Sequence, residues 1–229
     1  MILPLIAAIS LSLVFLVETF AWFLRANALK DGRAYVISKS NIILYSSRGF
    51  AFGFQASISY YLETQGIASG VFFVCIVGFV TATLTHTLTF YNPVVRRVVW
   101  NCMVGLMKKI NRWDSNLMAN ELASICRVRS PQLFIVTSIS TAIFGLAITL
   151  PYLLALYNPT FRLTFTSLIQ LLNFFGTIFL LYLVDPIMYK LMDKCELKFS
   201  IYDYIAGRIA GFLISLFVSF IAMSFLGSN

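Results

Sequence analysis

Six stretches of about twenty mostly apolar residues recur along this chain, and they constrain its fold more than any other feature. A helix rises about 1.5 Å per residue, so about 20 residues span the roughly 30 Å hydrocarbon core of a bilayer. The chain of 229 residues is 59% hydrophobic and 11% charged, which is more apolar than a soluble domain. The sequence therefore predicts an all-α, polytopic integral membrane protein with one transmembrane domain over residues 1–229. The predicted spans are 2–24, 40–61, 68–91, 132–156, 163–184 and 201–226.

The second stretch, 40–61, is the least apolar of the six because Ser46, Ser47, Arg48 and Gln55 interrupt it. Such residues are tolerated in a membrane where a helix faces other helices rather than lipid. We therefore expect this stretch to cross the membrane with its polar side chains turned into the bundle.

Basic residues gather in three of the connections between these stretches. They account for fourteen of the seventeen Lys and Arg residues. The net charge of +8 is thus explained by the positive-inside rule, and no nucleic-acid partner is expected. The same rule places both termini on the outer side of the membrane. The basic residues in question are Arg25, Lys30, Arg33, Lys39, Arg96, Arg97, Lys108, Lys109, Arg112, Arg127, Arg129, Lys190, Lys194 and Lys198.

The connector 94–130 has apolar residues at helical spacing, and basic residues occupy its other faces. This pattern is typical of an amphipathic helix that lies in the membrane interface. Two interpretations stay open: the helix fixes orientation against anionic lipid, or it gathers anionic head groups near a portal. The apolar positions are Val95, Val98, Val99, Cys102, Met103, Leu106, Ile110 and Trp113.

Four ionisable residues fall inside the predicted spans: Glu18, Arg48, His86 and Arg208. A charge at mid-membrane costs about 2.5–3.5 kcal/mol on insertion scales, so such residues commonly mark a partner or a functional cavity. Counted at 1.5 Å per residue, all four lie about 8–12 Å from the cytoplasmic ends of their spans. We therefore expect them at a similar depth in four different helices.

One carboxylate cannot neutralise two guanidinium groups, so Glu18, Arg48 and Arg208 carry a surplus positive charge. An anionic ligand would balance this surplus, and arginine is well suited to binding phosphate oxygens. The alternative is that Glu18 pairs with one arginine only to stabilise the bundle. Both arginines lie beside glycines spaced four apart, Gly49 with Gly53 and Gly207 with Gly211. This spacing allows close helix packing or leaves room beside the guanidinium.

Three further polar residues are candidates for the same site. His86, flanked by threonines, acts either as an interior hydrogen-bonding group or as a proton relay. Asn41 and Gln55 either contribute hydrogen bonds to a ligand or join neighbouring helices. Asp185, followed by Pro186, is expected to end the fifth span rather than to bind a ligand.

Motifs for catalysis and metal binding are absent from the sequence. It contains no GxxxxGK[ST], HExxH or GxSxG motif and only one histidine, so no cofactor, metal or enzymatic activity is expected. The four cysteines show no CxxC spacing, and no disulfide is expected among them. They are Cys75, Cys102, Cys126 and Cys195.

Four segments together resemble one known family: LVETFAWFLR, NIILYSSRGFAFGFQ, LVDPIMYKLMD and YDYIAGRIAG. They are similar to the alternate lipid II flippases of bacteria, the Amj family. The resemblance implies a flippase of the bacterial cytoplasmic membrane. Its substrate would be an undecaprenyl-pyrophosphate-linked glycan, with lipid II as the first candidate, moved from the inner to the outer leaflet.

On this resemblance, Glu18, Arg48 and Arg208 would be substrate-site residues, supported by Asn41 and Gln55. His86 is kept as a further candidate for the substrate site. The membrane potential could drive transport of an anion, or Glu18 or His86 could couple it to protons.

Two rival hypotheses remain: a non-transporting membrane partner with structural ion pairs, and a small integral enzyme that acts on lipid phosphates. Membrane lipids are expected partners in every case. One copy with six helices is small for enclosing a bulky head group. A homodimer and a groove along which the head group slides are therefore both open.

Overall fold

The structure is a computed structural model that describes residues 2–65, 68–111, 130–157 and 159–226. All regular secondary structure within these ranges is helical. The long helices agree closely with the predicted spans. The α-helices are α1 (Ile2–Ala26), α2 (Arg33–Thr64), α3 (Ala68–His86), α4 (Pro93–Asn111), α5 (Pro131–Tyr157), α6 (Arg162–Phe179), α7 (Asp185–Asp193) and α8 (Leu197–Leu226). Short helical segments are η1 (Lys30–Gly32), η2 (Thr87–Tyr91), η4 (Pro159–Phe161) and η5 (Leu180–Val184).

Five helical segments in the described part of the chain are long and apolar enough to cross a membrane. The predicted class, an all-α multi-pass membrane protein, is therefore confirmed. The remaining predicted span forms α2, which has 32 residues but is diluted by the polar residues named above. The five segments are Ile2–Ala26, Ala68–Tyr91, Pro131–Leu156, Ser167–Asp193 and Leu197–Ser224.

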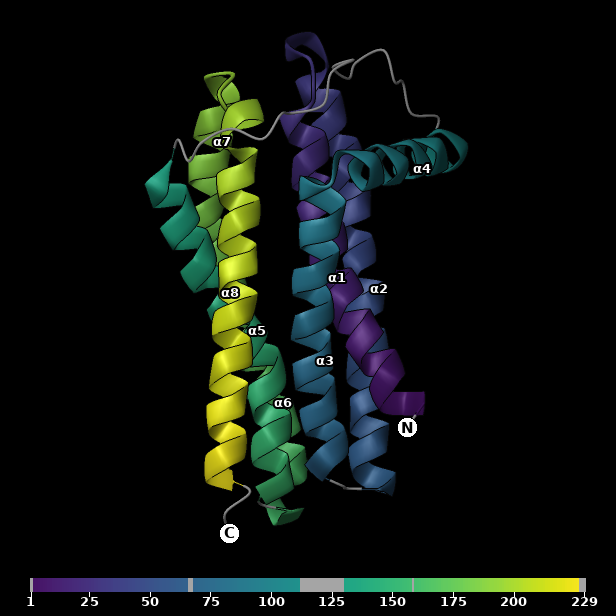
Figure 1. Ribbon diagram of the computed structural model, residues 1–229, viewed down its shortest axis with the longest axis vertical. Helices are drawn as coiled ribbons and strands as arrows, with labels where there is room; N and C mark the ends of the chain where they lie inside the picture. Colours follow the sequence, from purple (N-terminus) through teal and green to yellow (C-terminus); the bar gives the residue numbers. More distant parts are fainter. Residues whose placement is uncertain (1, 66–67, 112–129, 158, 227–229) are drawn as a thin grey trace.

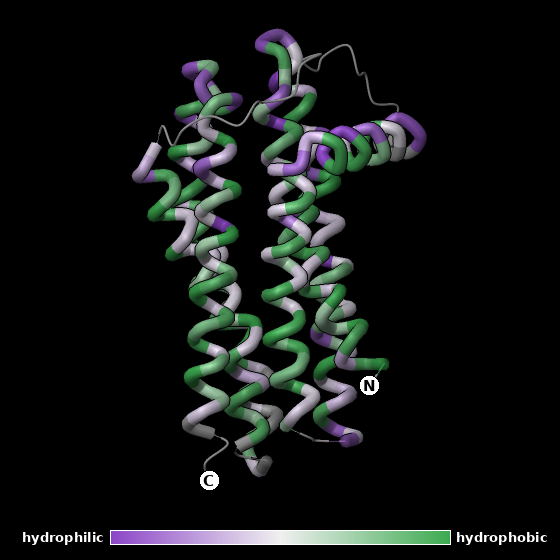
Figure 2. The backbone as a smooth tube through the Cα atoms, viewed as in Figure 1, coloured by the Kyte–Doolittle hydropathy of each residue, from purple (hydrophilic) through white to green (hydrophobic). Residues whose placement is uncertain are grey.

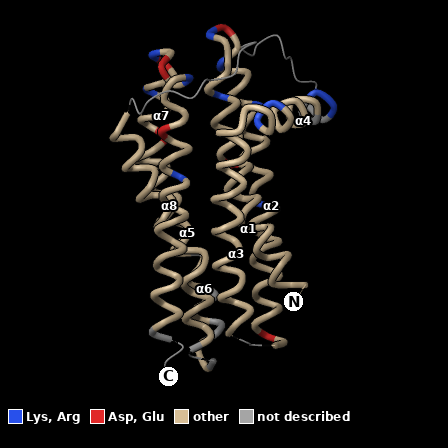
Figure 3. Tube along the Cα trace, viewed as in Figure 1, with Lys and Arg blue, Asp and Glu red and all other residues tan. Residues whose placement is uncertain are grey.

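The long helices run side by side, and both ends of the chain lie at the same end of the bundle (Figure 1). Apolar residues dominate the bundle along its length (Figure 2). Lys and Arg residues gather at the opposite end and on α4 (Figure 3). We call this opposite end the basic end.

The long helices form two groups of three. In the first group α1 packs against α2 and α3, and in the second α5 packs against α6 and α8. The groups meet chiefly where α3 packs against α8, with smaller contacts of α1 with α8 and of α3 with α5. The chain enters the second group from the opposite end (Figure 1), and α5 packs against α6 and α8 as α1 packs against α2 and α3. This is the arrangement of an inverted-topology repeat.

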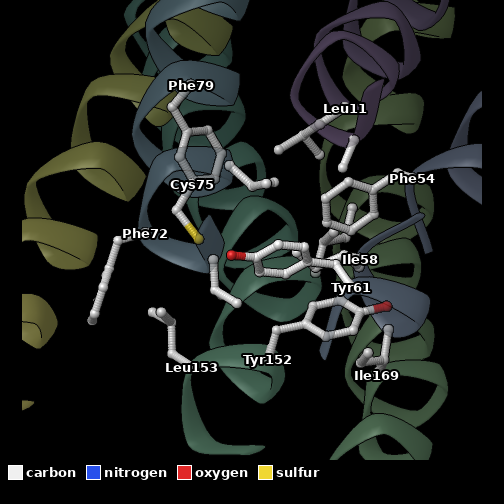
Figure 4. Close-up of a cluster of buried hydrophobic side chains, with 14 of the residues drawn as sticks. Leu11, Phe54, Ile58, Tyr61, Phe72, Cys75, Phe79, Tyr152, Leu153 and Ile169 are labelled. Carbon is white, nitrogen blue, oxygen red and sulfur yellow. The ribbon is translucent and has the colours of Figure 1, made fainter. Parts of the chain in front are cut away.

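A cluster of buried apolar side chains closes the half of the bundle nearer the chain ends (Figure 4). It includes Leu11 of α1, Phe54 of α2, Phe79 of α3 and Tyr152 of α5. Buried apolar contacts thus join the two groups of helices at that end.

Close packing of α5 against α8 depends on Gly207 and Gly211. A Cβ atom at Gly207 would lie 2.7 Å from the carbonyl oxygen of Phe134, and one at Gly211 would lie 2.8 Å from that of Ser138. Glycine is therefore required at both positions, which hold Arg208 of α8 in its place. Gly49 of α2 differs, because a Cβ there would have no neighbouring atom within 4 Å.

Within the predicted connector, α4 forms a helix that runs crosswise to the long helices near the basic end of the bundle (Figure 1). Its partly buried Val99, Trp100 and Met103 pack against the bundle core. Arg97 and Lys108 are exposed. Residues 112–129 of the predicted connector lie outside the described residues.

Candidate functional site

A cavity of about 630 Å³ lies between the two groups of helices. Its walls come from α1 and α2 on one side and from α5, α6, η5, α7 and α8 on the other. Charged and polar side chains line the part nearer the basic end. Leu11, Phe54, Phe144 and Ile148 line the part nearer the chain ends. The cavity is therefore amphipathic, and the cluster of Figure 4, which contains Leu11 and Phe54, forms its apolar floor.

The cavity opens sideways between α2 and the η5–α7 segment. Tyr45 and Phe52 of α2 and Leu181 of η5 line it, and these side chains are 65%, 72% and 53% exposed. Within the described ranges, α2 makes no extensive contact with α6, η5 or α7. A molecule could therefore enter the cavity from the side of the bundle without first separating packed helices.

Regular helical spacing places the charged groups on the cavity walls. Glu18, Trp22 and Arg25 are four and three residues apart and lie on one face of α1. Arg25 Nη2 donates a hydrogen bond of 2.7 Å to Asn41 Oδ1 on α2. Glu18 lies seven residues before Arg25, and Arg48 lies seven residues after Asn41. Both therefore lie about 10 Å further from the basic end than this hydrogen bond.

Glu18 and Arg208 form an ion pair across the cavity wall. Arg208 Nη2 lies 2.9 Å from Glu18 Oε2, and Arg208 Nη1 donates a 2.9 Å hydrogen bond to Tyr204 Oη. The guanidinium carbon is also 5.4 Å from the ring centre of Phe15 and 5.9 Å from that of Phe212. The pairing predicted as an alternative thus forms, and Arg208 rather than Arg48 is the partner of Glu18.

Arg25 is buried, and its hydrogen-bond partners are all uncharged. Its Nε donates to Ser40 Oγ at 2.8 Å, its Nη2 to Asn41, and its Nη1 to Tyr189 Oη at a longer 3.5 Å. Its guanidinium carbon lies 4.3 Å from the centre of the Trp22 ring, a cation–π contact. No carboxylate of the described chain pairs with it within 4 Å.

Arg48 lines the same cavity but is exposed, at its sideways opening. It makes no hydrogen bond or ion pair with any described residue. Gln55 also lines the cavity, toward its apolar part. Of the two predicted amides, Asn41 therefore accepts a hydrogen bond from Arg25, whereas the amide of Gln55 makes no hydrogen bond with the described residues.

His86 is fully buried and does not line the cavity. Its Nδ1 lies 2.8 Å from the carbonyl oxygen of Ala82, which can only accept, so Nδ1 carries the hydrogen. Its Nε2 lies 2.8 Å from Thr19 Oγ1. The ring also packs edge-on against Phe212, with the ring centres 4.9 Å apart. Its geometry is that of the interior hydrogen-bonding group.

Asp185 of α7 brings a second carboxylate to the cavity wall. It forms no hydrogen bond or ion pair with the described residues. The cavity thus holds three guanidinium groups, on Arg25, Arg48 and Arg208, and two carboxylates, which leaves one surplus positive charge. Arg25 and Arg48 carry positive charge that no directly paired carboxylate neutralises.

Sequence reasoning missed Arg25 and Asp185 as cavity residues. Arg25 was assigned to the basic connector because it follows the last apolar residue of its span. Its spacing of seven from Glu18 indicates the shared face and could have identified it. Asp185 was interpreted as the end of a span, and nothing in its local sequence distinguishes the two roles. In the described part of the chain, no three His, Cys, Asp or Glu residues form a group that could hold a metal ion.

No family model matches the chain, and no match is found among curated proteins or solved structures. The fold and the cavity themselves define a multi-pass, all-helical membrane protein with an amphipathic cavity of net positive charge.

Proposed function

We propose that this protein moves an undecaprenyl-pyrophosphate-linked glycan from the inner to the outer leaflet of the bacterial cytoplasmic membrane. Lipid II is the substrate favoured by the resemblance of its polar segments to the alternate lipid II flippases. The observation that carries the proposal is the cavity: it has surplus arginine charge at one end, an apolar floor, and a sideways opening between α2 and η5–α7.

In the proposed membrane placement, α2 is the sixth crossing helix. Its 32 residues exceed the roughly 20 that are needed to cross, and it packs along α1, which is apolar enough to cross by itself. The polar residues that dilute its hydropathy include Arg48 and Gln55, both of which line the cavity rather than packing against apolar neighbours. The basic end then lies in the cytoplasm, both termini lie outside, and α4 lies in the inner interface.

This placement puts the arginines where the head group of such a lipid begins its path. The diphosphate would enter through the opening at Arg48 and meet the charged part of the cavity. The prenyl chain would remain in the bilayer outside the opening, because that opening faces sideways. Arginine can bind phosphate oxygens through two parallel hydrogen bonds, which fixes orientation as well as charge.

The inverted repeat of the two helix groups supports transport over a purely structural role. Transporters with such repeats commonly bind substrate between the repeats and expose it by moving one repeat against the other. Here the cavity lies between the groups, and the ion pair of Glu18 with Arg208 also joins them. A cell interior that is negative by 100 mV favours outward movement of an anion by about 2.3 kcal/mol per charge.

Complementation tests this proposal. A bacterium depleted of its essential lipid II flippase would receive the wild-type protein, Arg48→Gln or the control Arg97→Gln, at equal membrane abundance. Arg97 is exposed on α4 and lies outside the cavity. Growth with the wild type and the control but not with Arg48→Gln is expected. Failure of an abundant wild-type protein to restore growth would contradict lipid II transport, and rescue by Arg48→Gln would contradict the role of the cavity.

A further inference from the structure

We infer that Arg25 binds a phosphate of the lipid head group within the cavity, and that Arg208 positions this site without contacting the ligand. This inference rests on the proposed function and deepens it, because it names the residue that binds the phosphate. That residue lies at the C-terminal end of α1, where the sequence predicted only a basic connector. The ligand class is a lipid with a diphosphate head group, and the second phosphate would meet Arg48.

The guanidinium of Arg25 is fixed in position before any ligand binds. Ser40 and Asn41 fix two of its nitrogens from α2, and the Trp22 ring supports one face of the guanidinium. A buried cation with only neutral partners is costly unless an anion joins it. Asp185 acts on Arg25 electrostatically but forms no ion pair with it within 4 Å. Because its direct contacts are neutral, Arg25 can still bind an incoming anion.

The guanidinium of Arg25 also retains unused donors. It has five N–H groups, and its bonds to Ser40, Asn41 and Tyr189 use three of them. One N–H remains on each terminal nitrogen, and guanidinium N–H groups are donors well suited to phosphate oxygens. The bond to Tyr189 is the longest of the three, at 3.5 Å, so it is the contact that a phosphate oxygen would most easily replace.

Arg208 has the opposite character. Glu18 neutralises its charge at 2.9 Å, Tyr204 accepts its second hydrogen bond, and aromatic rings of Phe15 and Phe212 lie within 6 Å of its guanidinium carbon. Binding a phosphate there would require the ion pair to break. Arg208 therefore keeps Glu18 away from the other arginines, and this makes it a positioning residue.

Arg48 can serve the second phosphate because of its place on α2. It lies seven residues after Asn41, about 10 Å along the helix, and its exposed side chain lines the cavity. A diphosphate that enters past Arg48 would reach Arg25 at the buried, basic end of the cavity. The two arginines would then hold the head group from both sides.

The test uses the purified full-length protein in nanodiscs and measures the Kd of four probes. The probes are geranylgeranyl diphosphate, geranylgeranyl monophosphate, geranylgeraniol and inorganic pyrophosphate. The variants are Arg25→Lys, which keeps the charge but loses the forked donors, and Asn41→Asp, which gives Arg25 an internal carboxylate partner. Arg97→Gln is the control, and thermal unfolding checks that each variant is folded.

Wild-type protein and Arg97→Gln are expected to bind the lipid diphosphate more tightly than the other three probes. Arg25→Lys should weaken that binding by about tenfold to a hundredfold, the range for hydrogen bonds to charged groups. Asn41→Asp should weaken it similarly while keeping or raising thermal stability, because the new carboxylate satisfies Arg25. A third variant, Arg208→Lys, should lower thermal stability but leave the Kd for the lipid diphosphate near that of the wild type.

Two kinds of result would overturn the inference, and they differ from each other. If the wild type prefers the lipid diphosphate but folded Arg25→Lys and Asn41→Asp bind it within about twofold of wild type, Arg25 is not the anchor and the proposed function stands. If the wild type binds the diphosphate no better than the alcohol, or binds free pyrophosphate as tightly as the lipid, the proposed function fails as well.

Discussion

Glu18 of α1 and Arg208 of α8 form one ion pair, 2.9 Å between oxygen and nitrogen, that joins the two helix groups of the bundle. Both side chains line the cavity, yet each is largely withdrawn from the surface of the protein. The pair therefore contributes to the contact between the groups and also sets which arginines remain unpaired.

Removal of one member of this pair should destabilise the protein, and exchange of the two should largely restore its stability. Glu18→Gln is expected to lower the free energy of unfolding by about 1.5–3 kcal/mol, the range for a hydrogen bond to a charged group. The double variant Glu18→Arg with Arg208→Glu should recover most of this loss. Thermal unfolding of the purified variants measures both effects. If Glu18→Gln is as stable as wild type, the pair does not hold the groups together.

The exchanged double variant also separates structure from transport. It would place an arginine on α1, four residues from Trp22, and a carboxylate on α8 beside Tyr204. In a purely structural protein, recovered stability would be accompanied by recovered function. Under the proposed function, transport should remain impaired, because the exchange puts a new arginine on the face of α1 that carries Arg25 and so alters the charge around the anchoring site.

The glycines of α2 and α8 should respond differently to alanine. At Gly207 and Gly211 a Cβ would meet backbone carbonyl oxygens at 2.7 and 2.8 Å, and these cannot move without shifting α5. Each substitution is expected to lower the free energy of unfolding by about 1–3 kcal/mol, the usual effect of overpacking. Gly49→Ala is the matched control: it has open space and should be neutral or slightly stabilising. Equal effects at Gly49 and Gly211 in thermal unfolding would contradict the packing of α5 against α8.

Asp185 should oppose binding of an anionic head group, because it brings a negative charge to the same cavity. Asp185→Asn is expected to lower the Kd for geranylgeranyl diphosphate by about fivefold, which corresponds to roughly 1 kcal/mol of lost repulsion. Asp193→Asn, at the exposed end of α7 and outside the cavity, is the control and should leave the Kd unchanged. A weaker affinity in Asp185→Asn would mean that this carboxylate helps to bind the ligand or to hold Arg25.

His86 is expected to contribute to stability and not to proton coupling. Both ring nitrogens have partners, on Ala82 and Thr19, and the side chain has no contact with the cavity. His86→Gln should lower the free energy of unfolding by about 1–3 kcal/mol, because buried hydrogen-bonding groups lose their partners. The pH dependence of transport should stay that of the wild type. A changed pH profile in a protein of unchanged stability would restore the proton-relay interpretation.

The sequence predicted the positions of the long helices well, because spans of this length follow directly from hydropathy. A helix in the connector before residue 112 was also predicted, since its apolar residues keep helical spacing, and its place in the membrane interface stays a prediction. The packing of the helices could not be predicted, because apolar surfaces in a membrane give little indication of which helix meets which. The inverted repeat therefore appears only in the structure.

For the site, the sequence predicted most of the polar residues that line the cavity, but it did not predict which arginine pairs with Glu18. Glu18, Arg48 and Arg208, three of the four ionisable residues expected at a similar depth, line one cavity together with Asn41 and Gln55. His86, the fourth, lies outside it. Which arginine pairs with Glu18 depends on the rotation of α2 and α8 about their axes, and hydropathy does not fix that rotation. Whether these residues bind a substrate stays a prediction.

The central claim is that the cavity takes an anionic lipid head group across the membrane, and reconstituted transport tests it most directly. Wild-type protein, Arg48→Gln and Arg97→Gln would be placed at equal density in liposomes that contain a fluorescent undecaprenyl-diphosphate-linked glycan in one leaflet. The loss of fluorescence to a membrane-impermeant quencher then follows movement between leaflets. We expect movement with the wild type and with Arg97→Gln, and a rate near that of empty liposomes with Arg48→Gln. Movement that is as fast with Arg48→Gln as with the wild type, or no movement with any of the three, would contradict the account.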